Sequence, residues 1–86
     1  MKDLTIKKNI LKCFEEINIF ISKFDEKDEL KNYIFESFQF ISLIMEIEEH
    51  FKIIIPDEAL YFENFATFEQ LFKLIKELLK LKTIKI

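Results

Sequence analysis

The sequence contains no glycine and only one proline, Pro56, in 86 residues. Glycine is the usual residue wherever the backbone needs a positive φ, so tight β-hairpin turns have no default residue in this chain. Neither the dinucleotide-binding fingerprint nor the Walker phosphate loop can be written without glycine. The sequence therefore favours helices joined by polar loops, and it excludes the nucleotide-binding classes that depend on those two motifs.

Cysteine and histidine occur once each, as Cys13 and His50. One cysteine cannot form an intramolecular disulfide, and the two residues together cannot supply the four ligands of a structural zinc site. No apolar run approaches the roughly 20 residues of a membrane span, and the N-terminus lacks the apolar region of a signal peptide. We therefore expect an unexported protein of the reducing cytoplasm.

Apolar residues make up 50% of the sequence and charged residues 34%, the composition of a folded domain. The length predicts a single domain over residues 1–86, which we expect to be monomeric. Charge is unevenly distributed along it. Between residues 36 and 63 there are seven acidic residues and one lysine, and from residue 64 onward five lysines and two glutamates. An acidic middle segment argues against nucleic acid as its partner and favours a basic protein surface.

Three stretches place apolar residues at helical spacing. The first predicts a helix from about Leu4 to Ile17, which could continue toward Ser22, with Asp3 as its N-cap. The second predicts a helix from Ser37 to Phe51. The residues expected to face the core from these two helices are Ile6, Ile10, Cys13, Phe14, Ile17, Phe40, Leu43, Ile44, Ile47 and Phe51.

The third stretch predicts a helix from Phe68 to about Leu81, and Thr67 with Gln70 forms a capping-box pattern before it. Pro56 separates the second helix from a short helix that begins near Asp57 and runs to about Phe62. The loop between the first two helices is long and carries one short helical turn at most. The apolar residues expected to anchor it are Phe20, Phe24, Leu30 and Ile34.

Few residues are suited to catalysis. His50 falls on the polar side of the second helix, where a solvent-exposed residue is a better interpretation than a general base. Cys13 falls on an apolar face and is expected to act as a small hydrophobe. Glu46, Glu48 and Glu49 could bind a metal, but acidic residues on an exposed helix are more often a solvated face. We predict no catalytic residue and no metal site.

A family resemblance covers residues 30 to 75. Glu36-Ser37-Phe38 opens the second helix, which runs to Phe51, and Ile53-Ile54-Ile55-Pro56-Asp57-Glu58 follows. This order and spacing resemble the signature of acyl and peptidyl carrier proteins. Asn64-Phe65-Ala66-Thr67 is similar to the turn that opens the last helix of that family. The resemblance implies an all-α four-helix bundle of the acyl-carrier type, with three longer helices, one short helix and a long first loop.

The same resemblance implies that a transferase joins 4'-phosphopantetheine to the Ser37 hydroxyl. A serine at a helix N-terminus is a preferred cap, and a phosphodiester there is stabilised by free backbone N–H groups. The departures from the family are Glu36 where Asp is usual and Phe38 where Leu is commoner, the latter pointing toward D-alanyl carriers and some peptidyl or polyketide carriers. Tyr33 and Ile34 occupy the place of the usual glycine, so the chain must enter the second helix by another kind of turn.

The implied function is recognition without bond chemistry. The protein would hold acyl or aminoacyl groups as thioesters and deliver them to enzymes of fatty acid, polyketide, nonribosomal peptide or D-alanine transfer pathways. Phe40 and Ile44 would border any cleft that shelters the cargo. The residues expected to face the transferase and the acyl-transferring or acyl-modifying enzymes, through basic docking patches, are Glu36, Phe38, Ser42, Met45, Glu46 and Glu49. The alternative is a small helical interaction module with an acidic docking helix, no prosthetic group, and Ser37 only as a cap.

Overall fold

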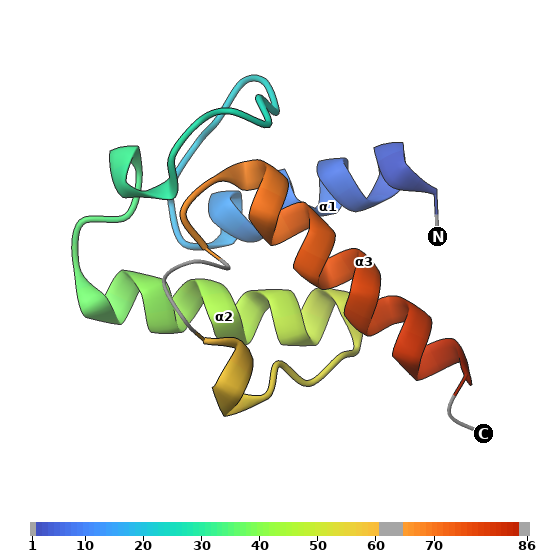
Figure 1. Cartoon of the computed structure of the whole chain (residues 1–86). Helices are drawn as coiled ribbons and strands as arrows, with labels where there is room; N and C mark the ends of the chain where they lie inside the picture. Colours follow the sequence, from blue (N-terminus) through green and yellow to red (C-terminus); the bar gives the residue numbers. More distant parts are fainter. Residues whose placement is uncertain (1, 61–64, 85–86) are drawn as a thin grey trace.

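The computed structural model describes residues 2–60 and 65–84 (Figure 1). Over these residues the chain forms three α-helices and no β-strand: α1 at Asp3–Glu16, α2 at Ser37–Phe51 and α3 at Phe68–Ile84. Two single 3-10 turns lie between them, η1 at Leu30–Asn32 and η2 at Asp57–Ala59. The prediction of an all-helical fold is confirmed. None of the described helices is long and apolar enough to cross a membrane.

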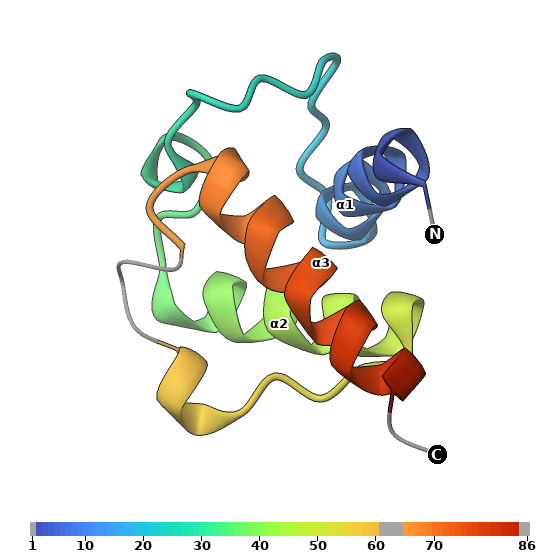
Figure 2. The same ribbon diagram turned by 45° about the vertical axis from the view of Figure 1, so that its right-hand side comes forward.

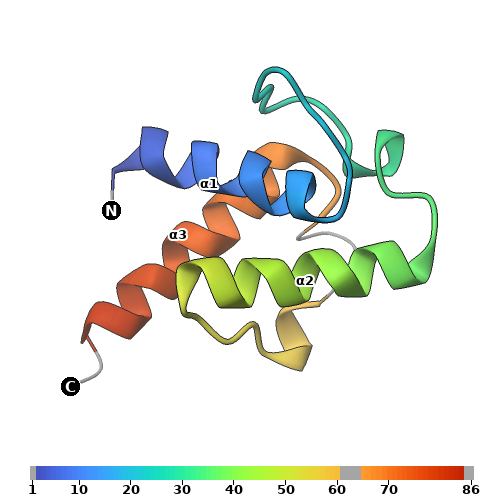
Figure 3. The same cartoon turned by 180° about the vertical axis from the view of Figure 1, so that it is seen from behind.

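The three helices meet around one apolar core. α1 and α2 lie side by side with opposite chain directions, and α3 crosses both (Figures 1 and 3). The connection that follows α2 returns beside that helix through η2 (Figure 2). As a result, the η1 turn and the start of α2 lie at the end of the molecule opposite the first turn of α1 and the last turn of α3.

The buried face of each helix follows the predicted periodicity. Ile17 and Phe40 are only partly buried, and the remaining predicted core residues of α1 and α2 are buried, as are Phe68, Leu71, Phe72 and Ile75 of α3. Phe14 packs against Phe68 with ring centroids 5.2 Å apart. The residues buried in the helices are Ile6, Ile10, Cys13, Phe14, Leu43, Ile44, Ile47, Phe51, Phe68, Leu71, Phe72 and Ile75.

The boundaries of α1 differ from the prediction at both ends. Lys2 is the N-cap residue and Asp3 is already helical, so the prediction of Asp3 as the N-cap is wrong. Asn18 takes a φ of 65°, and the Ile19 N–H donates to the Phe14 carbonyl at 2.9 Å. This left-handed termination ends the helix at Glu16, so the helix does not continue toward Ser22.

Lys52 ends α2 in the same way, with a φ of 55°. The Ile53 N–H donates to the Glu48 carbonyl at 3.2 Å, and the Glu48 carboxylate accepts from the Ile55 N–H at 2.9 Å. Asparagine and lysine thus occupy the positions for which glycine is preferred. The helix ends at Phe51, as predicted.

The long loop between α1 and α2 closes the N-terminus of α3. The carbonyls of Asp28 and Glu26 accept from the N–H groups of Phe68 and Glu69, each at 3.0 Å. These two N–H groups lie in the first turn of α3 and have no partner within the helix. The loop therefore takes part in the packing of the bundle.

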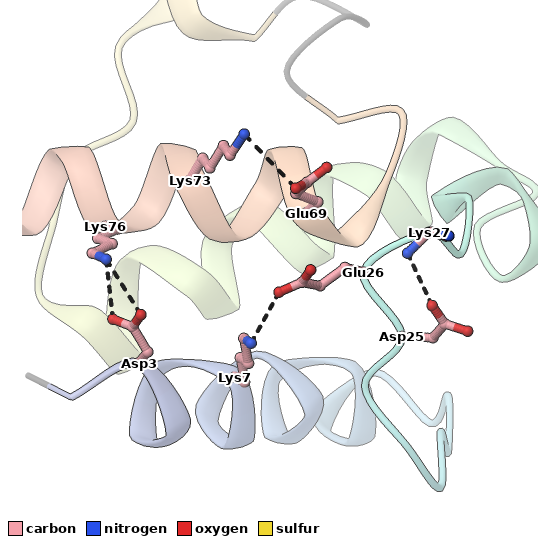
Figure 4. Close-up of polar contacts among 8 residues, drawn as sticks. All are labelled: Asp3, Lys7, Asp25, Glu26, Lys27, Glu69, Lys73 and Lys76. Atoms are coloured by element: carbon pink, nitrogen blue, oxygen red, sulfur yellow. Dashed lines mark hydrogen bonds and ion pairs between the residues drawn. The ribbon is translucent and has the colours of Figure 1, made fainter.

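Most of the residues expected to anchor this loop do so. Leu30 is buried, and Phe24 and Ile34 are partly buried against the core, but Phe20 is 75% exposed and is not an anchor. A lysine on α1 also contacts this loop. Lys7 Nζ lies 3.0 Å from the Glu26 carboxylate (Figure 4). The same atom lies 5.6 Å from the centroid of the Phe24 ring.

After Pro56, where a short helix was predicted, the described residues form the single 3-10 turn η2. This 3-10 turn begins at Asp57, as expected, and Pro56 is its N-cap residue. The predicted end at Phe62 lies outside the described residues, as does Asn64 in the turn before α3.

Candidate functional site

Ser37 is the first residue inside α2, one position later than a cap. Glu36 has extended backbone angles, φ −130° and ψ 149°, and its carbonyl accepts the N–H groups of Gln39 and Phe40 at 3.1 and 3.2 Å. These are the properties of an N-cap residue, so α2 begins at Ser37 as predicted, and the alternative interpretation of Ser37 as only a cap is contradicted. Capping therefore does not account for the Ser37 side chain.

Gln39 performs the side-chain part of the capping. Its amide oxygen accepts from the N–H groups of Phe35 at 2.8 Å and Glu36 at 3.0 Å. The Ser37 side chain is exposed and makes no hydrogen bond within residues 2–60 and 65–84. Its hydroxyl is therefore open to an approaching reagent.

The backbone around Ser37 offers donors to an anion. The N–H groups of Ser37 and Phe38 make no hydrogen bond to any other described residue. They lie in the first turn of a 15-residue helix, where the helix dipole favours negative charge. A serine ester of phosphate would thus find two free donors beside its own oxygen.

The chain reaches this position without a positive φ. Among the described residues only Asn18 and Lys52 have one, so Tyr33 and Ile34 do not imitate the missing glycine. The turn comes from η1 instead, where the N–H groups of Tyr33 and Ile34 both donate to the Leu30 carbonyl at 2.9 Å. Tyr33 also packs edge-on against Phe68, which fixes the segment from inside.

The predicted partner residues divide into two groups. Glu36, Phe38, Met45 and Glu49 are exposed, whereas Ser42 and Glu46 are half-buried. The Glu46 carboxylate lies 3.8 Å from His50 Nε2, close enough for a charge-assisted contact when the imidazole is protonated. The structure thus places four of the six side chains fully on the surface.

Two exposed apolar residues near Ser37 were missed by sequence reasoning. Phe35 is 77% exposed, and Ile41 is 58% exposed on the same side of α2 as Phe38 and Met45. The spacing Phe38, Ile41, Met45 is itself helical and could have identified Ile41. No periodic signal was available for Phe35, because it precedes the helix.

An apolar pocket lies beside the first turn of α2. It has a volume of about 300 Å³ and is lined by Leu30, Lys31, Ile34, Phe40, Leu60 and Phe65. The rings of Phe40 and Phe65 meet edge to face, with centroids 5.1 Å apart. Phe40 therefore borders a cavity as expected, whereas Ile44 does not line this pocket and packs in the core.

The other titratable candidates lie apart from Ser37. Cys13 is fully buried, and burial together with the charges of Glu46 and Glu16 raises the pKa of its thiol to about 12. A thiol with such a pKa is not nucleophilic at neutral pH. Among the described residues no group of three or more acidic, cysteine or histidine side chains could hold a metal ion.

Comparison with protein families gives one match for this chain. The family described as "Phosphopantetheine attachment site" matches residues 10–75, which is well over half of the 86 residues. The matched range begins in α1, contains Ser37 and the whole of α2, and ends in α3. No curated protein and no solved structure matches the chain.

Proposed function

This chain belongs to the phosphopantetheine attachment family, whose members carry 4'-phosphopantetheine covalently, and we propose that its attachment residue is Ser37. The single observation that best supports this assignment is the Ser37 hydroxyl at the start of α2, which has no hydrogen-bond partner among the described residues and lies beside two N–H groups that have none there either. A serine that served only as a cap would have its oxygen engaged. Ser22 and Ser42 do not begin a helix.

The residues around Ser37 fit the arm. The N–H groups of Ser37 and Phe38 would hold the phosphate, and the dipole of α2 would favour its charge. The bound group supplies a thiol that holds an acyl or aminoacyl group as a thioester. Glu36 and Gln39 cap the start of α2, where Ser37 is presented.

The protein then acts as a carrier and performs no bond chemistry of its own. Its partners are a phosphopantetheinyl transferase and the acyl-transferring or acyl-modifying enzymes of fatty acid, polyketide, nonribosomal peptide or D-alanine transfer pathways. We propose that basic patches on these enzymes meet the face of α2 beside Ser37. Opposite charges on two surfaces speed their encounter and are weakened by salt. The proposed docking residues are Glu36, Phe38, Ser42, Met45, Glu46 and Glu49.

The fold supports this proposal in outline. Within the described residues, η2 stands where the carrier fold would have its short helix, and the first loop packs on α3 as part of the bundle. We propose that the whole chain is a single carrier domain of the four-helix type.

Mass spectrometry of the intact protein tests the attachment. The chain is incubated with coenzyme A and a promiscuous phosphopantetheinyl transferase, and we expect the mass to rise by one phosphopantetheine group. Ser37→Ala should abolish the increase, whereas Ser22→Ala, which removes another exposed serine, should keep it. An unchanged mass, with a known carrier loaded in a parallel reaction, would favour the interaction module without a prosthetic group.

A further inference from the structure

We propose that Phe35, which precedes α2, is an anchor residue that inserts into an apolar pocket of the enzyme docking at Ser37. The proposal rests on the assignment of Ser37 as the attachment residue. On this proposal, the surface of this chain that faces the enzyme has an apolar, aromatic centre, and acidic residues surround that centre. The kind of partner it fits is an enzyme whose docking face has an apolar pocket with lysine or arginine at its rim.

Phe35 is exposed although the residues on both sides of it are engaged. Ile34 is partly buried against the core, and Glu36 caps α2. The Phe35 side chain is 77% exposed and makes no ring contact with any described residue. A phenylalanine exposed to water contributes almost nothing to folding stability, whereas its burial in a partner would contribute substantially to the free energy of binding.

The location of Phe35 points to the enzymes that act at Ser37. One residue, Glu36, separates Phe35 from Ser37, so their Cα atoms are at most about 7 Å apart. Any enzyme that reaches the Ser37 hydroxyl must cover this surface. Phe38, Ile41 and Met45 are also exposed, and their spacing places them on one face of α2, which begins two positions after Phe35. We refer to these four exposed apolar side chains as the apolar patch, since such groups mark interaction sites.

The patch lies within acidic surroundings. Glu36 and Glu49 are exposed beside it, and neither is in an ion pair within the described part of the chain. An apolar patch with an acidic rim is complementary to an apolar pocket with a basic rim. This charge relation selects a basic enzyme face over a second copy of the chain, because two copies of the patch would bring like charges together.

The backbone of Phe35 is held in place before a partner arrives. Its N–H donates to the Gln39 amide oxygen at 2.8 Å, so the side chain projects from a fixed point at the start of α2. Phenylalanine has two side-chain torsions, and a preorganised aromatic residue loses little entropy on binding. These are the properties of an interface hot spot.

Phe20 provides a matched control. It is 75% exposed, almost the same as Phe35, but it lines a surface hollow together with Lys8 and Leu11 of α1. Both phenylalanines lie outside the helices, and neither contributes a buried side chain, so alanine at either position should leave the fold intact. Circular dichroism and urea midpoints would check this for each variant.

The test measures the kinetics of loading by a promiscuous phosphopantetheinyl transferase, with the carrier as the varied substrate. Phe35→Ala should raise KM roughly tenfold with kcat little changed, the effect of losing one anchor residue. Phe20→Ala should stay within about twofold of the parent, as expected of a surface substitution. The Phe35→Ala effect should persist at about 0.5 M salt, whereas the effect of Glu49→Gln should shrink.

A binding measurement separates docking from chemistry. In the Ser37→Ala background no loading occurs. There, Phe35→Ala should raise the dissociation constant of the complex with the transferase roughly tenfold, and Phe20→Ala should leave it unchanged. If Phe35→Ala and Phe20→Ala behave alike, or if only kcat changes, Phe35 is no anchor although Ser37 remains the attachment site. If the parent is never loaded while a known carrier is, the proposed function fails, and this inference fails with it.

Discussion

The side-chain amide oxygen of Gln39 lies 2.8 Å from the backbone nitrogen of Phe35 and accepts its hydrogen. The same oxygen accepts from Glu36, so one side chain fixes the chain on the approach to α2. Gln70 does the same before α3, where its amide oxygen accepts from Ala66 at 3.1 Å and Thr67 at 3.3 Å. Both helices thus begin with a glutamine at their third position.

Replacing Gln39 should destabilise the protein. Gln39→Ala removes the acceptor of two N–H groups, and we expect the free energy of unfolding to fall by about 1 kcal/mol, the usual size of a capping interaction. Gln39→Glu retains an acceptor and should lose much less. Urea denaturation measures both variants, with Gln70→Ala as the comparison at α3. Equal stability of Gln39→Ala and the parent would mean that the hydrogen bonds to Phe35 and Glu36 contribute nothing.

These two helix starts also show how far the sequence could predict the structure. The start of α3 was predicted correctly, because Thr67 and Gln70 form a familiar capping pattern. The start of α2 uses the same glutamine, but the cap is Glu36, and glutamate is not a usual cap residue. The predicted helix from Ser37 to Phe51 has the observed bounds, but the sequence did not identify Glu36 as its cap. The identity of the cap matters, because it decides whether the Ser37 hydroxyl is engaged in capping.

The helical core could be predicted, whereas the exposure of individual phenylalanines could not. Leu43, Ile47 and Phe51 follow a period that fixes the buried face of α2. Phe20 and Phe35 lie in connections, where no period applies, and in a chain with eleven phenylalanines aromatic character alone does not distinguish anchor from surface. Their exposure depends on how the loop packs against α1 and α3, which is a long-range property.

A glycine at position 52 should stabilise the protein. Lys52 has a φ of 55°, a conformation that costs a residue with a Cβ roughly 1–2 kcal/mol. Lys52→Gly removes that cost and increases the freedom of the unfolded chain, so we expect a net gain of about 0.5–1 kcal/mol in the free energy of unfolding. Lys52→Ala removes the charge and keeps the Cβ, so it should bring no gain. A comparable gain in Lys52→Ala would trace the effect to charge and contradict this account.

Stability should fall in alkali because of Cys13. Burial, with the Glu46 and Glu16 charges, raises the pKa of its thiol from 9.0 to about 12 in the folded state. The unfolded chain therefore loses this proton near pH 9 while the folded chain keeps it. The stabilisation is fully present below pH 9 and is lost progressively as the pH rises toward about 12.

Urea unfolding at about pH 8 and about pH 10 measures this loss, which cannot exceed roughly 1.4 kcal/mol per pH unit for one proton. Cys13→Ala should have a flatter dependence on pH. Part of the slope should remain, because the hydrogen bond that Tyr33 donates to Asp28 raises the pKa of the tyrosine and acts in the same direction. If Cys13→Ala is as sensitive to alkali as the parent, the thiol is not responsible.

Ser37→Ala should leave the stability of the protein almost unchanged. The Ser37 hydroxyl makes no hydrogen bond within the described residues, so its removal should change the free energy of unfolding by no more than about 0.5 kcal/mol. Thr67 is the matched case, since its Oγ1 accepts from the Gln70 N–H at 3.3 Å. Thr67→Ala should cost about 1 kcal/mol. Urea denaturation of the two variants side by side decides the role of Ser37.

A loss in Ser37→Ala as large as that in Thr67→Ala would mean that the hydroxyl is a cap after all. An unchanged stability would leave the hydroxyl with no structural task, and it would make Ser37→Ala a fully folded control for the loading experiment.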